Sequence, residues 1–434
     1  MSQTISRRTT PLVGSYRPEG DKSLSHRALL FAALAEGEST IRRFLVGGVT
    51  RAMLRCLQAL GVEWSLDETA HILTVKGVGL HGFKAPSEPL HCGNSATTFR
   101  LLAGALAGAG IPCVLDGSEG LRKRPMGRIV DPLTLMGAKV TAVDGHAPLT
   151  FEPAPLNAIS YTLPVASAQV KSCLILAALS ADGPCAFSEP GPSRDHTERM
   201  LSAMGAQVKS FAQSGTNRAY GAVAFPQMMP LKPLNTELAG DISSAAFLLV
   251  AATIVPGSDF ALEAVGVNPT RTGILDALNA MGAKITCEHP AEMAGEPTAT
   301  IHVQAAPLKG TTIEGDLVVR MIDEFPAFMI AAACAEGETL VRDAAELRTK
   351  ESDRIAIMTA ELRKLGVDIE EYPDGFRIRG TGRIPGGATV QAHGDHRVAM
   401  SLALAALVAE QPVTIEGFEM LNESFPDFPT VLGL

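Results

Sequence analysis

The sequence predicts an α/β protein built from six similar repeats of helix and strand, each roughly 70–80 residues long. The first of two observations behind this prediction is a polar residue that opens an Ala- and Leu-rich segment, at spacings of 73, 73, 74, 82 and 72 residues. The six opening residues are Asp21, Asn94, Ser167, Asp241, Asp323 and Asp395. Each residue type accepts hydrogen bonds from the free amides of a helix's first turn, so each is expected to cap a helix. In four copies a glycine follows 16 residues later, where we expect the helix to end: Gly37, Gly110, Gly183 and Gly257.

The second observation is a triplet of a hydrophobic residue, a glycine and another hydrophobic residue, which closes an amphipathic run such as Arg51–Leu60 or Ile274–Met281. The triplets are centred on Gly61, Gly137, Gly205, Gly282 and Gly366, with a sixth around Gly433. Strands are expected directly after four of them, at 139–141, 207–208, 284–286 and 368–369. Glycine after a helix is common in all proteins, but two independent markers in the same phase favour a true repeat. Each repeat is longer than most solenoid periods, so we expect a small α/β subdomain.

The amino-acid composition limits the classes of protein to which the chain can belong. The 434 residues are 46% hydrophobic and 5% aromatic, so the chain can bury a large aliphatic core. A net charge of −9 argues against nonspecific binding to nucleic acid or to an anionic membrane. The seven cysteines are scattered and form no CxxC pair, which is typical of reduced thiols in a cytoplasm. No signal peptide is visible, and the apolar segments are too short to span a bilayer.

The best candidate for a linker between domains is the segment 226–235, which holds three prolines and lies between the third and fourth repeats. Three repeats on each side make the natural division. The first 19 residues are too few for a repeat, and we expect them to add a strand to whichever domain lies nearby.

Two basic segments predict an anion site. Gly20–Arg27 places Lys22, two hydroxyls and Arg27 in the first turns of a helix, and helix N-termini attract anions. Leu121–Arg128 holds four cations within an acidic protein. A solvated helix cap and an exposed loop are the simpler alternatives. Repulsion among the four cations nevertheless favours an anionic ligand.

Two further segments carry carboxylates. Met321–Pro326 sets Asp323 and Glu324 beside apolar residues, where burial would raise a carboxyl pKa and suit it to proton transfer. For Asp323 the alternative is a plain helix cap. Arg348–Arg354 alternates charges, as an ordinary helix surface also does, and we expect a structural role for His396.

The sequence contains no motif for metal binding, nucleotide binding or a serine nucleophile. The ten histidines show no metal-ligand spacing, and the chain has no Walker loop, no dinucleotide-binding glycine motif after a strand and no nucleophile elbow. The site predicted from the residues binds a polyanion and moves protons without a metal or cofactor.

Five segments resemble the signatures of the EPSP synthase (3-phosphoshikimate 1-carboxyvinyltransferase) family. They are Gly20–Ser23, Gly93–Arg100, Arg122–Met126, Lys350–Arg354 and Gly394–Arg397. The resemblance runs from about residue 11 to the end of the chain. It implies a two-domain, inside-out α/β barrel fold of six β-α-β-α-β-β units, with the helix N-termini facing the cleft between the domains. Because chains of this family cross between domains twice, the implied domains are residues 20–232, and residues 1–19 with 233–434.

The resemblance implies transfer of the enolpyruvyl group of phosphoenolpyruvate (PEP) to the 5-hydroxyl of shikimate-3-phosphate through a tetrahedral intermediate, in the shikimate pathway of aromatic amino-acid biosynthesis. Asp323 would take the proton of the 5-hydroxyl, Glu351 would protonate the PEP methylene, and Lys22 would assist at the departing phosphate. The residues implied for PEP are Lys22, Asn94, Ala96, Arg124, Gln169, Arg354 and Arg397. The residues implied for shikimate-3-phosphate are Ser23, Arg27, Ser167, Ala168, Gln169, Ser193, Arg194, Asp323 and Lys350. No cofactor is implied, and we expect a cytoplasmic monomer.

The sequence departs from the commonest family pattern at several positions. Glu423 stands where some members have a lysine that contacts PEP, Gly48-Val49 replace a pair of acids, and Asn94-Ser95-Ala96-Thr97 replaces Asn-Ala-Gly-Thr. These departures, together with Ser193–His196, resemble the divergent, class II-like branch. We therefore expect glyphosate tolerance, with the Ala96 methyl group clashing with an inhibitor longer than PEP.

Two alternatives remain. The sister transferase that acts on UDP-N-acetylglucosamine carries a reactive cysteine in the loop before its Arg-Pro pair, but residues 119–124 contain none and Cys113 falls in an expected strand. A non-catalytic relative that only binds phosphorylated ligands is expected to lose Asp323 or Glu351, and both are present.

Overall fold

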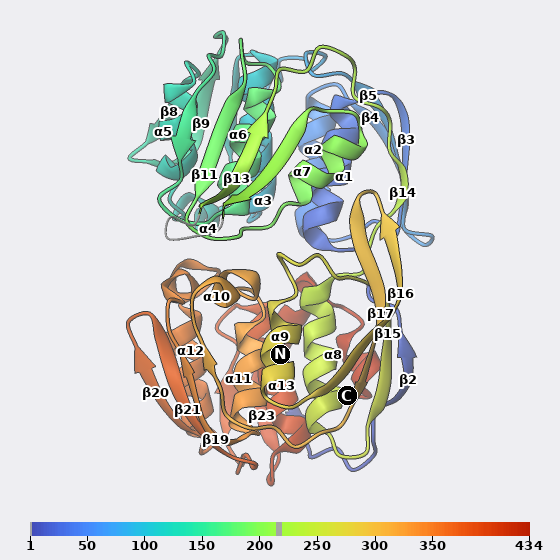
Figure 1. Cartoon of the computed structure of the whole chain (residues 1–434), viewed down its shortest axis with the longest axis vertical. Helices are drawn as coiled ribbons and strands as arrows, with labels where there is room; N and C mark the ends of the chain where they lie inside the picture. Colours follow the sequence, from blue (N-terminus) through green and yellow to red (C-terminus); the bar gives the residue numbers. More distant parts are fainter. Residues whose placement is uncertain (1, 214–218) are drawn as a thin grey trace. The chain divides into compact units, whose positions relative to one another are not determined.

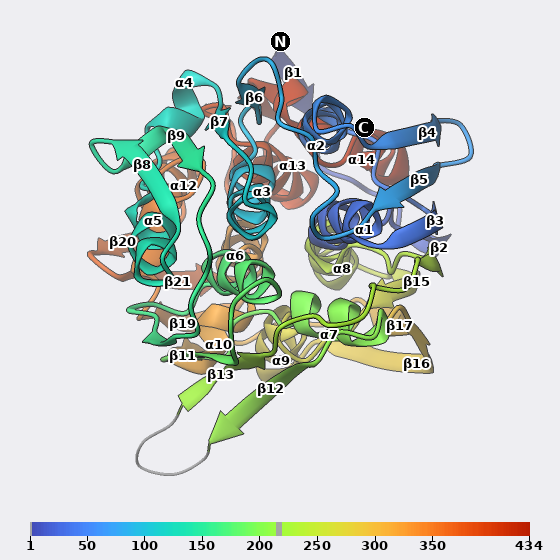
Figure 2. The same ribbon diagram turned by 90° about the horizontal axis from the view of Figure 1, so that it is seen from above.

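The computed structural model describes residues 2–213 and 219–434, and Figures 1 and 2 show it in two views. These residues form two compact units. The amino-terminal unit is Glu19–Ala239 with Glu292–Glu296, and the carboxy-terminal unit is Met1–Pro18, Gly240–Ala291 and Pro297–Leu434.

The amino-terminal unit contains three four-stranded sheets, of order β14-β3-β5-β4, β6-β7-β9-β8 and β10-β11-β13-β12. In each sheet the first pair of strands is parallel and the other pairs are antiparallel. The strands are β3 (Glu36–Arg42), β4 (Glu63–Asp67), β5 (Ile72–Val78), β6 (Leu90–His91), β7 (Cys113–Asp116), β8 (Lys139–Val143), β9 (His146–Glu152), β10 (Ser160–Thr162), β11 (Cys185–Glu189), β12 (Val208–Gln213), β13 (Ala219–Ala224) and β14 (Asn235–Glu237). The helices are α1 (Lys22–Leu34), α2 (Gly48–Ala59), α3 (Ala96–Ala109), α4 (Glu119–Arg122), α5 (Gly127–Leu135), α6 (Ala168–Ala178) and α7 (His196–Ala203).

The carboxy-terminal unit has two four-stranded sheets, β16-β17-β15-β2 and β18-β19-β21-β20, and one three-stranded sheet, β1-β23-β22. Its strands are β1 (Ser2–Ile5), β2 (Val13–Tyr16), β15 (Asp259–Gly266), β16 (Lys284–Met293), β17 (Glu296–Gln304), β18 (Thr312–Ile313), β19 (Glu336–Val341), β20 (Asp368–Tyr372), β21 (Gly375–Thr381), β22 (Thr389–Gln391) and β23 (Val413–Glu416). Its helices are α8 (Ile242–Ile254), α9 (Gly273–Ala280), α10 (Asp316–Arg320), α11 (Phe325–Ala333), η1 (Ala345–Thr349), α12 (Arg354–Lys364), α13 (His396–Val408), η2 (Phe418–Glu423) and α14 (Phe428–Leu432). The first 19 residues supply β1 and β2, so the expectation of an added strand is confirmed twice over.

The Ala- and Leu-rich segments are the inner helices of each unit. In α8 and α11 nearly every residue is buried, as in a helix that is hydrophobic all round. Figure 1 shows α8, α11 and α13 side by side, and Figure 2 shows α1, α3 and α6 with the sheets of their unit outside them. The predicted α/β fold of six repeats is confirmed.

The glycine triplets are also confirmed as helix ends. Each central glycine follows a helix and has a positive φ, from 63° at Gly433 to 94° at Gly205 and Gly282. Glycine is favoured there because a side chain would strain a left-handed backbone.

Some predicted helix boundaries are wrong. Helix α3 is capped by Ser95 rather than Asn94. The N-cap position of α11 is Glu324 rather than Asp323, and the Glu324 side chain makes no capping hydrogen bond. Of the four glycines expected to end a first helix, only Gly110 is the C-cap. The helices α1, α6 and α8 end sooner, at Leu34, Ala178 and Ile254, and after α1 the strand β3 begins almost at once, at Glu36.

Candidate functional site

Predicted ligand-binding residues begin the inner helices of the amino-terminal unit. Lys22, Ala96 and Ala168 are the first residues of α1, α3 and α6, so their backbone amides lie at helix N-termini. The Asp21 carboxylate caps α1 by accepting from the Leu24 amide at 2.8 Å. Ser167 also stands at a cap position, but its hydroxyl makes no capping hydrogen bond. The other predicted residues lie next to helices of this unit: Ser23 on α1, Asn94 before α3, Arg124 between α4 and α5, and Ser193 and Arg194 before α7.

Arg27 is buried, and the groups that accept hydrogen bonds from its guanidinium carry no formal charge. Its guanidinium donates to the Thr197 hydroxyl at 2.8 Å, the Ser172 hydroxyl at 2.9 Å and the Ser23 carbonyl at 3.2 Å. Burial lowers the pKa of Arg27 to about 10, which still leaves it charged near neutral pH. Sequence reasoning selected Arg27 but missed Thr197, because a small polar residue carries no signal of its own.

Gln169 is held from two sides. Its side-chain oxygen accepts from Arg100 at 2.5 Å, and its amide nitrogen donates to the Thr97 hydroxyl at 3.0 Å. Arg100 also donates to the carbonyl of Pro125 at 3.4 Å. Residues of the second and third repeats therefore converge, and Arg100 connects Gln169 to the basic segment that contains Arg124.

A buried charge cluster lies behind the two predicted serines. Glu189 accepts from the Ser193 hydroxyl at 2.7 Å, the Lys171 ammonium at 2.6 Å and the Ser167 amide at 3.3 Å. The Lys171 nitrogen lies 3.0 Å from a Glu198 oxygen. Burial alone would lower the pKa of Lys171, but the carboxylates of Glu198 and Glu189 raise it above its usual value. Sequence reasoning missed both glutamates.

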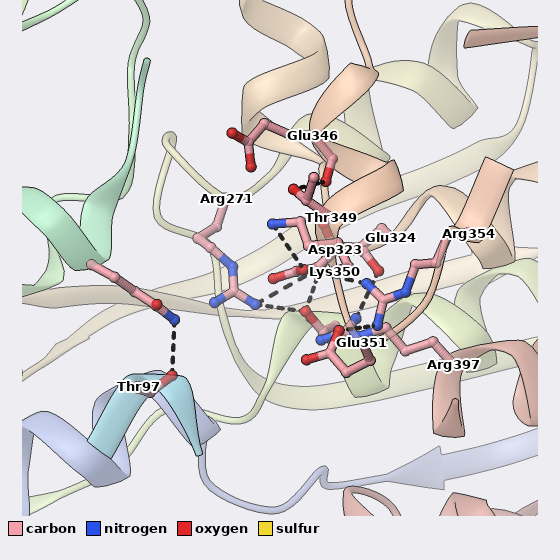
Figure 3. Close-up of polar contacts among 12 residues, drawn as sticks. Thr97, Arg271, Asp323, Glu324, Glu346, Thr349, Lys350, Glu351, Arg354 and Arg397 are labelled. Atoms are coloured by element: carbon pink, nitrogen blue, oxygen red, sulfur yellow. Dashed lines mark hydrogen bonds and ion pairs between the residues drawn. The ribbon is translucent and has the colours of Figure 1, made fainter. Parts of the chain in front are cut away.

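In the carboxy-terminal unit the predicted residues gather around one buried guanidinium (Figure 3). Arg354 donates to Asp395 at 2.9 Å and to Glu351 at 2.7 Å, and it lies 3.7 Å from Asp323. Only 1% of its side chain is exposed, against 18% for Asp323 and 30% for Glu351. Burial alone would lower the pKa of Arg354, but the Asp395 and Glu351 carboxylates raise it well above its usual value.

Asp323 and Asp395 connect the other predicted cations to this cluster. The Lys350 nitrogen lies 4.0 Å from an Asp323 oxygen, and Arg397 donates to the Asp323 carbonyl at 2.7 Å. Asp395 caps α13 by accepting from the Arg397 amide at 2.9 Å, and it also accepts from the Ser352 hydroxyl at 2.9 Å. The alternative that 348–354 is a plain helix surface does not fit Arg354, whose side chain is buried among carboxylates.

A second buried carboxylate stands beside Asp323. Glu324 is fully buried and accepts from the Ser243 hydroxyl, which also accepts from Arg271 at 2.7 Å. Arg271 in turn lies 3.3 Å from Asp241, the cap of α8. These residues fix the backbone at Asp323, and Arg271 was missed because an isolated arginine has no motif.

The described parts of the chain hold no group of three or more His, Cys, Asp or Glu residues suited to a metal ion. Within the same residues, no helix is long and apolar enough to cross a bilayer. The charged groups that the structure brings together in each unit suit anion binding, and those around Arg354 also suit proton transfer.

Known proteins match the chain over its whole length. The family model described as EPSP synthase (3-phosphoshikimate 1-carboxyvinyltransferase) matches residues 6–432. The chain belongs to this family. A 3-phosphoshikimate 1-carboxyvinyltransferase from Acidithiobacillus ferrooxidans is 47% identical over 99% of this chain and 97% of the relative. A second protein of that name, from Alkalilimnicola ehrlichii, is 49% identical over 97% of this chain and 93% of the relative.

Solved structures agree with the family assignment. An EPSP synthase from Acinetobacter baumannii superposes with a TM-score of 0.88 at 42% identity, covering 100% of this chain and 97% of the other. The enolpyruvyl transferase NikO from Streptomyces tendae is 17% identical with a TM-score of 0.77, which shows a shared fold alone. Membership of the EPSP synthase family makes this chain an enzyme.

Proposed function

We propose that the chain transfers the enolpyruvyl group of PEP to the 5-hydroxyl of shikimate-3-phosphate, with release of phosphate. Family membership supports the reaction. The observation that carries the assignment of roles is the arrangement of Asp323 and Glu351 around Arg354, at 3.7 and 2.7 Å. Two carboxylates on one buried cation can take up and deliver protons while the cation holds an anionic substrate.

In this proposal Asp323 is the general base. An opposite charge within about 4–6 Å favours the ionised form of a carboxyl group. Lys350 and Arg354 both satisfy this condition at Asp323, so the carboxylate is ready to accept the proton of the substrate hydroxyl.

Glu351 is the proposed acid, and its contact with Arg354 gives it a way to gain a proton. Without substrate, the 2.7 Å ion pair favours ionised Glu351. When PEP places its negative charge against Arg354 and Arg397, the field that holds Glu351 ionised weakens. The carboxyl group can then take up a proton and deliver it to the PEP methylene carbon.

The remaining binding roles follow the family motifs. We assign Lys22, Asn94, Ala96, Arg124 and Gln169 to PEP along with Arg354 and Arg397, and Lys22 also to the departing phosphate. We assign Ser23, Arg27, Ser167, Ala168, Gln169, Ser193, Arg194 and Lys350 to shikimate-3-phosphate along with Asp323. We further propose that the two compact units are the two domains of the family, which the resemblance places at residues 20–232 and at residues 1–19 with 233–434, and that the protein is a cytoplasmic monomer.

The experiment that tests the reaction is release of phosphate from PEP, measured with and without shikimate-3-phosphate. Release that depends on shikimate-3-phosphate, with formation of the enolpyruvyl ether, is expected. Release that depends instead on UDP-N-acetylglucosamine would overturn the assignment in favour of the sister transferase. Binding of shikimate-3-phosphate without any turnover would favour a non-catalytic relative.

We also propose that the enzyme tolerates glyphosate. Ala96 begins α3 and is 5% exposed, so its methyl group lies in a packed environment. Overpacking a tight site typically costs about 1–3 kcal/mol, which is roughly tenfold or more in affinity. We expect Ala96→Gly to become more sensitive to glyphosate with little change in the KM for PEP. Equal inhibition of both forms would contradict the steric role and leave a gain in helix propensity as the effect of the methyl group.

A further inference from the structure

The turn that precedes α13 has an unusual backbone. The Asp395 amide donates to the Ala392 carbonyl at 2.9 Å, and both residues between them have positive φ, 51° at His393 and 73° at Gly394. Turns of this kind favour Gly, Asn and Asp at both central positions. His393 is therefore in a strained conformation that needs support from its surroundings.

Glu361 of α12 supplies that support. Its side chain is 2% exposed and accepts from His393 Nε2 at 2.8 Å and from the Gln391 amide at 3.0 Å. The same carboxylate accepts from Lys364 of its own helix at 2.8 and 2.9 Å. Burial alone would raise the pKa of Glu361, but the hydrogen bonds from His393, Lys364 and the Gln391 amide stabilise the carboxylate and lower its pKa.

The second repeat has a related turn without this support, and only the first of its two central residues has a positive φ. There the Ser95 amide donates to the Cys92 carbonyl at 3.1 Å, and Gly93 occupies the position of His393 with a φ of 58°. Glycine adopts this conformation without strain. Histidine at position 393 therefore adds backbone strain that glycine would avoid. Its ring, unlike a glycine, can donate a hydrogen bond to Glu361.

We infer that Glu361 and His393 are a positioning pair that holds the turn before α13 against α12. Helix α12 begins with Arg354, and Glu361 lies seven residues later, about two helical turns along. Asp395 joins the same segments at the other end, through Arg354 and the Arg397 amide. The two attachments fix Arg397 relative to Arg354. The inference rests on the proposed function, in which both arginines bind PEP.

The test compares four variants in steady-state assays of phosphate release. Glu361→Gln keeps the shape but turns an amide donor towards His393 or Lys364. His393→Gly removes the ring and relieves the backbone strain, whereas His393→Gln keeps the strain but can place its amide nitrogen where Nε2 lies and still donate to Glu361. Lys364→Gln is the matched control, because it changes the same ion cluster without touching the turn.

We expect Glu361→Gln and His393→Gly to raise the KM for PEP about three- to tenfold, with kcat and the KM for shikimate-3-phosphate nearly unchanged. His393→Gln and Lys364→Gln should resemble the wild type. A normal KM for PEP in His393→Gly would overturn the inference, since Glu361 would then only offset strain. Equal loss for both substrates would overturn it in favour of general destabilisation. A wild type whose phosphate release ignores shikimate-3-phosphate would instead refute the proposed function, and the inference with it.

Discussion

The two units hold their most deeply buried arginines in opposite ways. Arg27 of the amino-terminal unit donates to two hydroxyls and a carbonyl, whereas Arg354 of the carboxy-terminal unit lies among the carboxylates of Asp395, Glu351 and Asp323. The consequence for their pKa values differs in sign. Burial lowers the pKa of Arg27 to about 10, but the carboxylates raise that of Arg354 despite equal burial.

This difference divides the chemistry between the units. Hydroxyl partners satisfy the Arg27 guanidinium without cancelling its charge, and the carboxylates of Glu198, Asp21 and Glu296 offset only part of the effect of burial on its pKa. The carboxylate partners of Arg354 offset its charge, and the Arg354 guanidinium in turn favours the ionised form of these carboxylates. Proton transfer is therefore expected of the carboxy-terminal unit alone.

Glu351→Gln tests this division most severely. The amide keeps a contact with Arg354 but cannot deliver a proton, so we expect kcat to fall by about 10²–10⁴-fold. Affinity for shikimate-3-phosphate, measured by equilibrium binding, should change far less. Asp323→Ala should behave alike because it removes the proposed base. The exposed Glu410→Gln serves as control, and near-normal turnover of Glu351→Gln would show that the proton comes from another group.

The next prediction compares the two buried arginines directly. Arg354→Met leaves the fully buried Asp395 without its main counter-ion, and breaking a buried pair in this way typically costs about 3–5 kcal/mol of unfolding free energy. Arg27→Met leaves mainly hydroxyl partners, for which about 1–3 kcal/mol is typical. Urea unfolding of both variants measures the difference. A larger loss for Arg27→Met would contradict the contrast between the units.

The sequence was sufficient for the fold because each repeat is marked locally. A glycine such as Gly205 is required by a left-handed helix end, and an alanine- and leucine-rich segment such as α8 has to be buried all round. Motifs also located the carboxylates and cations around Arg354. The sequence could not reveal Glu189, Arg271 or Glu361, because each acts through partners from distant segments and an isolated charged residue looks like surface.

The prediction for His26 concerns the amino-terminal unit and pH. His26 is fully buried, and burial lowers its pKa from 6.5 to about 4. As pH falls below 6.5, the unfolded chain takes up this proton before the folded chain does, so stability declines between pH 6.5 and 4, by about 3 kcal/mol in total. The single tryptophan, Trp64, lies on β4 of the same unit, and its fluorescence reports unfolding there. His26→Gln should flatten this decline, and an unchanged slope would assign the acid sensitivity to other groups.

The smallest expected change in stability distinguishes two serines that stand at helix cap positions in the amino-terminal unit. Ser95 caps α3 by accepting from the Thr98 amide at 3.1 Å, so Ser95→Ala should cost about 1 kcal/mol of stability. Ser167 occupies the same position on α6, yet its hydroxyl makes no capping bond and only its amide is held, by Glu189. Ser167→Ala should therefore leave the unfolding midpoint close to that of the wild type while weakening the binding of shikimate-3-phosphate. Trp64 fluorescence in urea and equilibrium binding measure the two quantities separately. Equal destabilisation by both substitutions would mean that the Ser167 hydroxyl serves the helix, and its proposed role in the substrate site would lose its support.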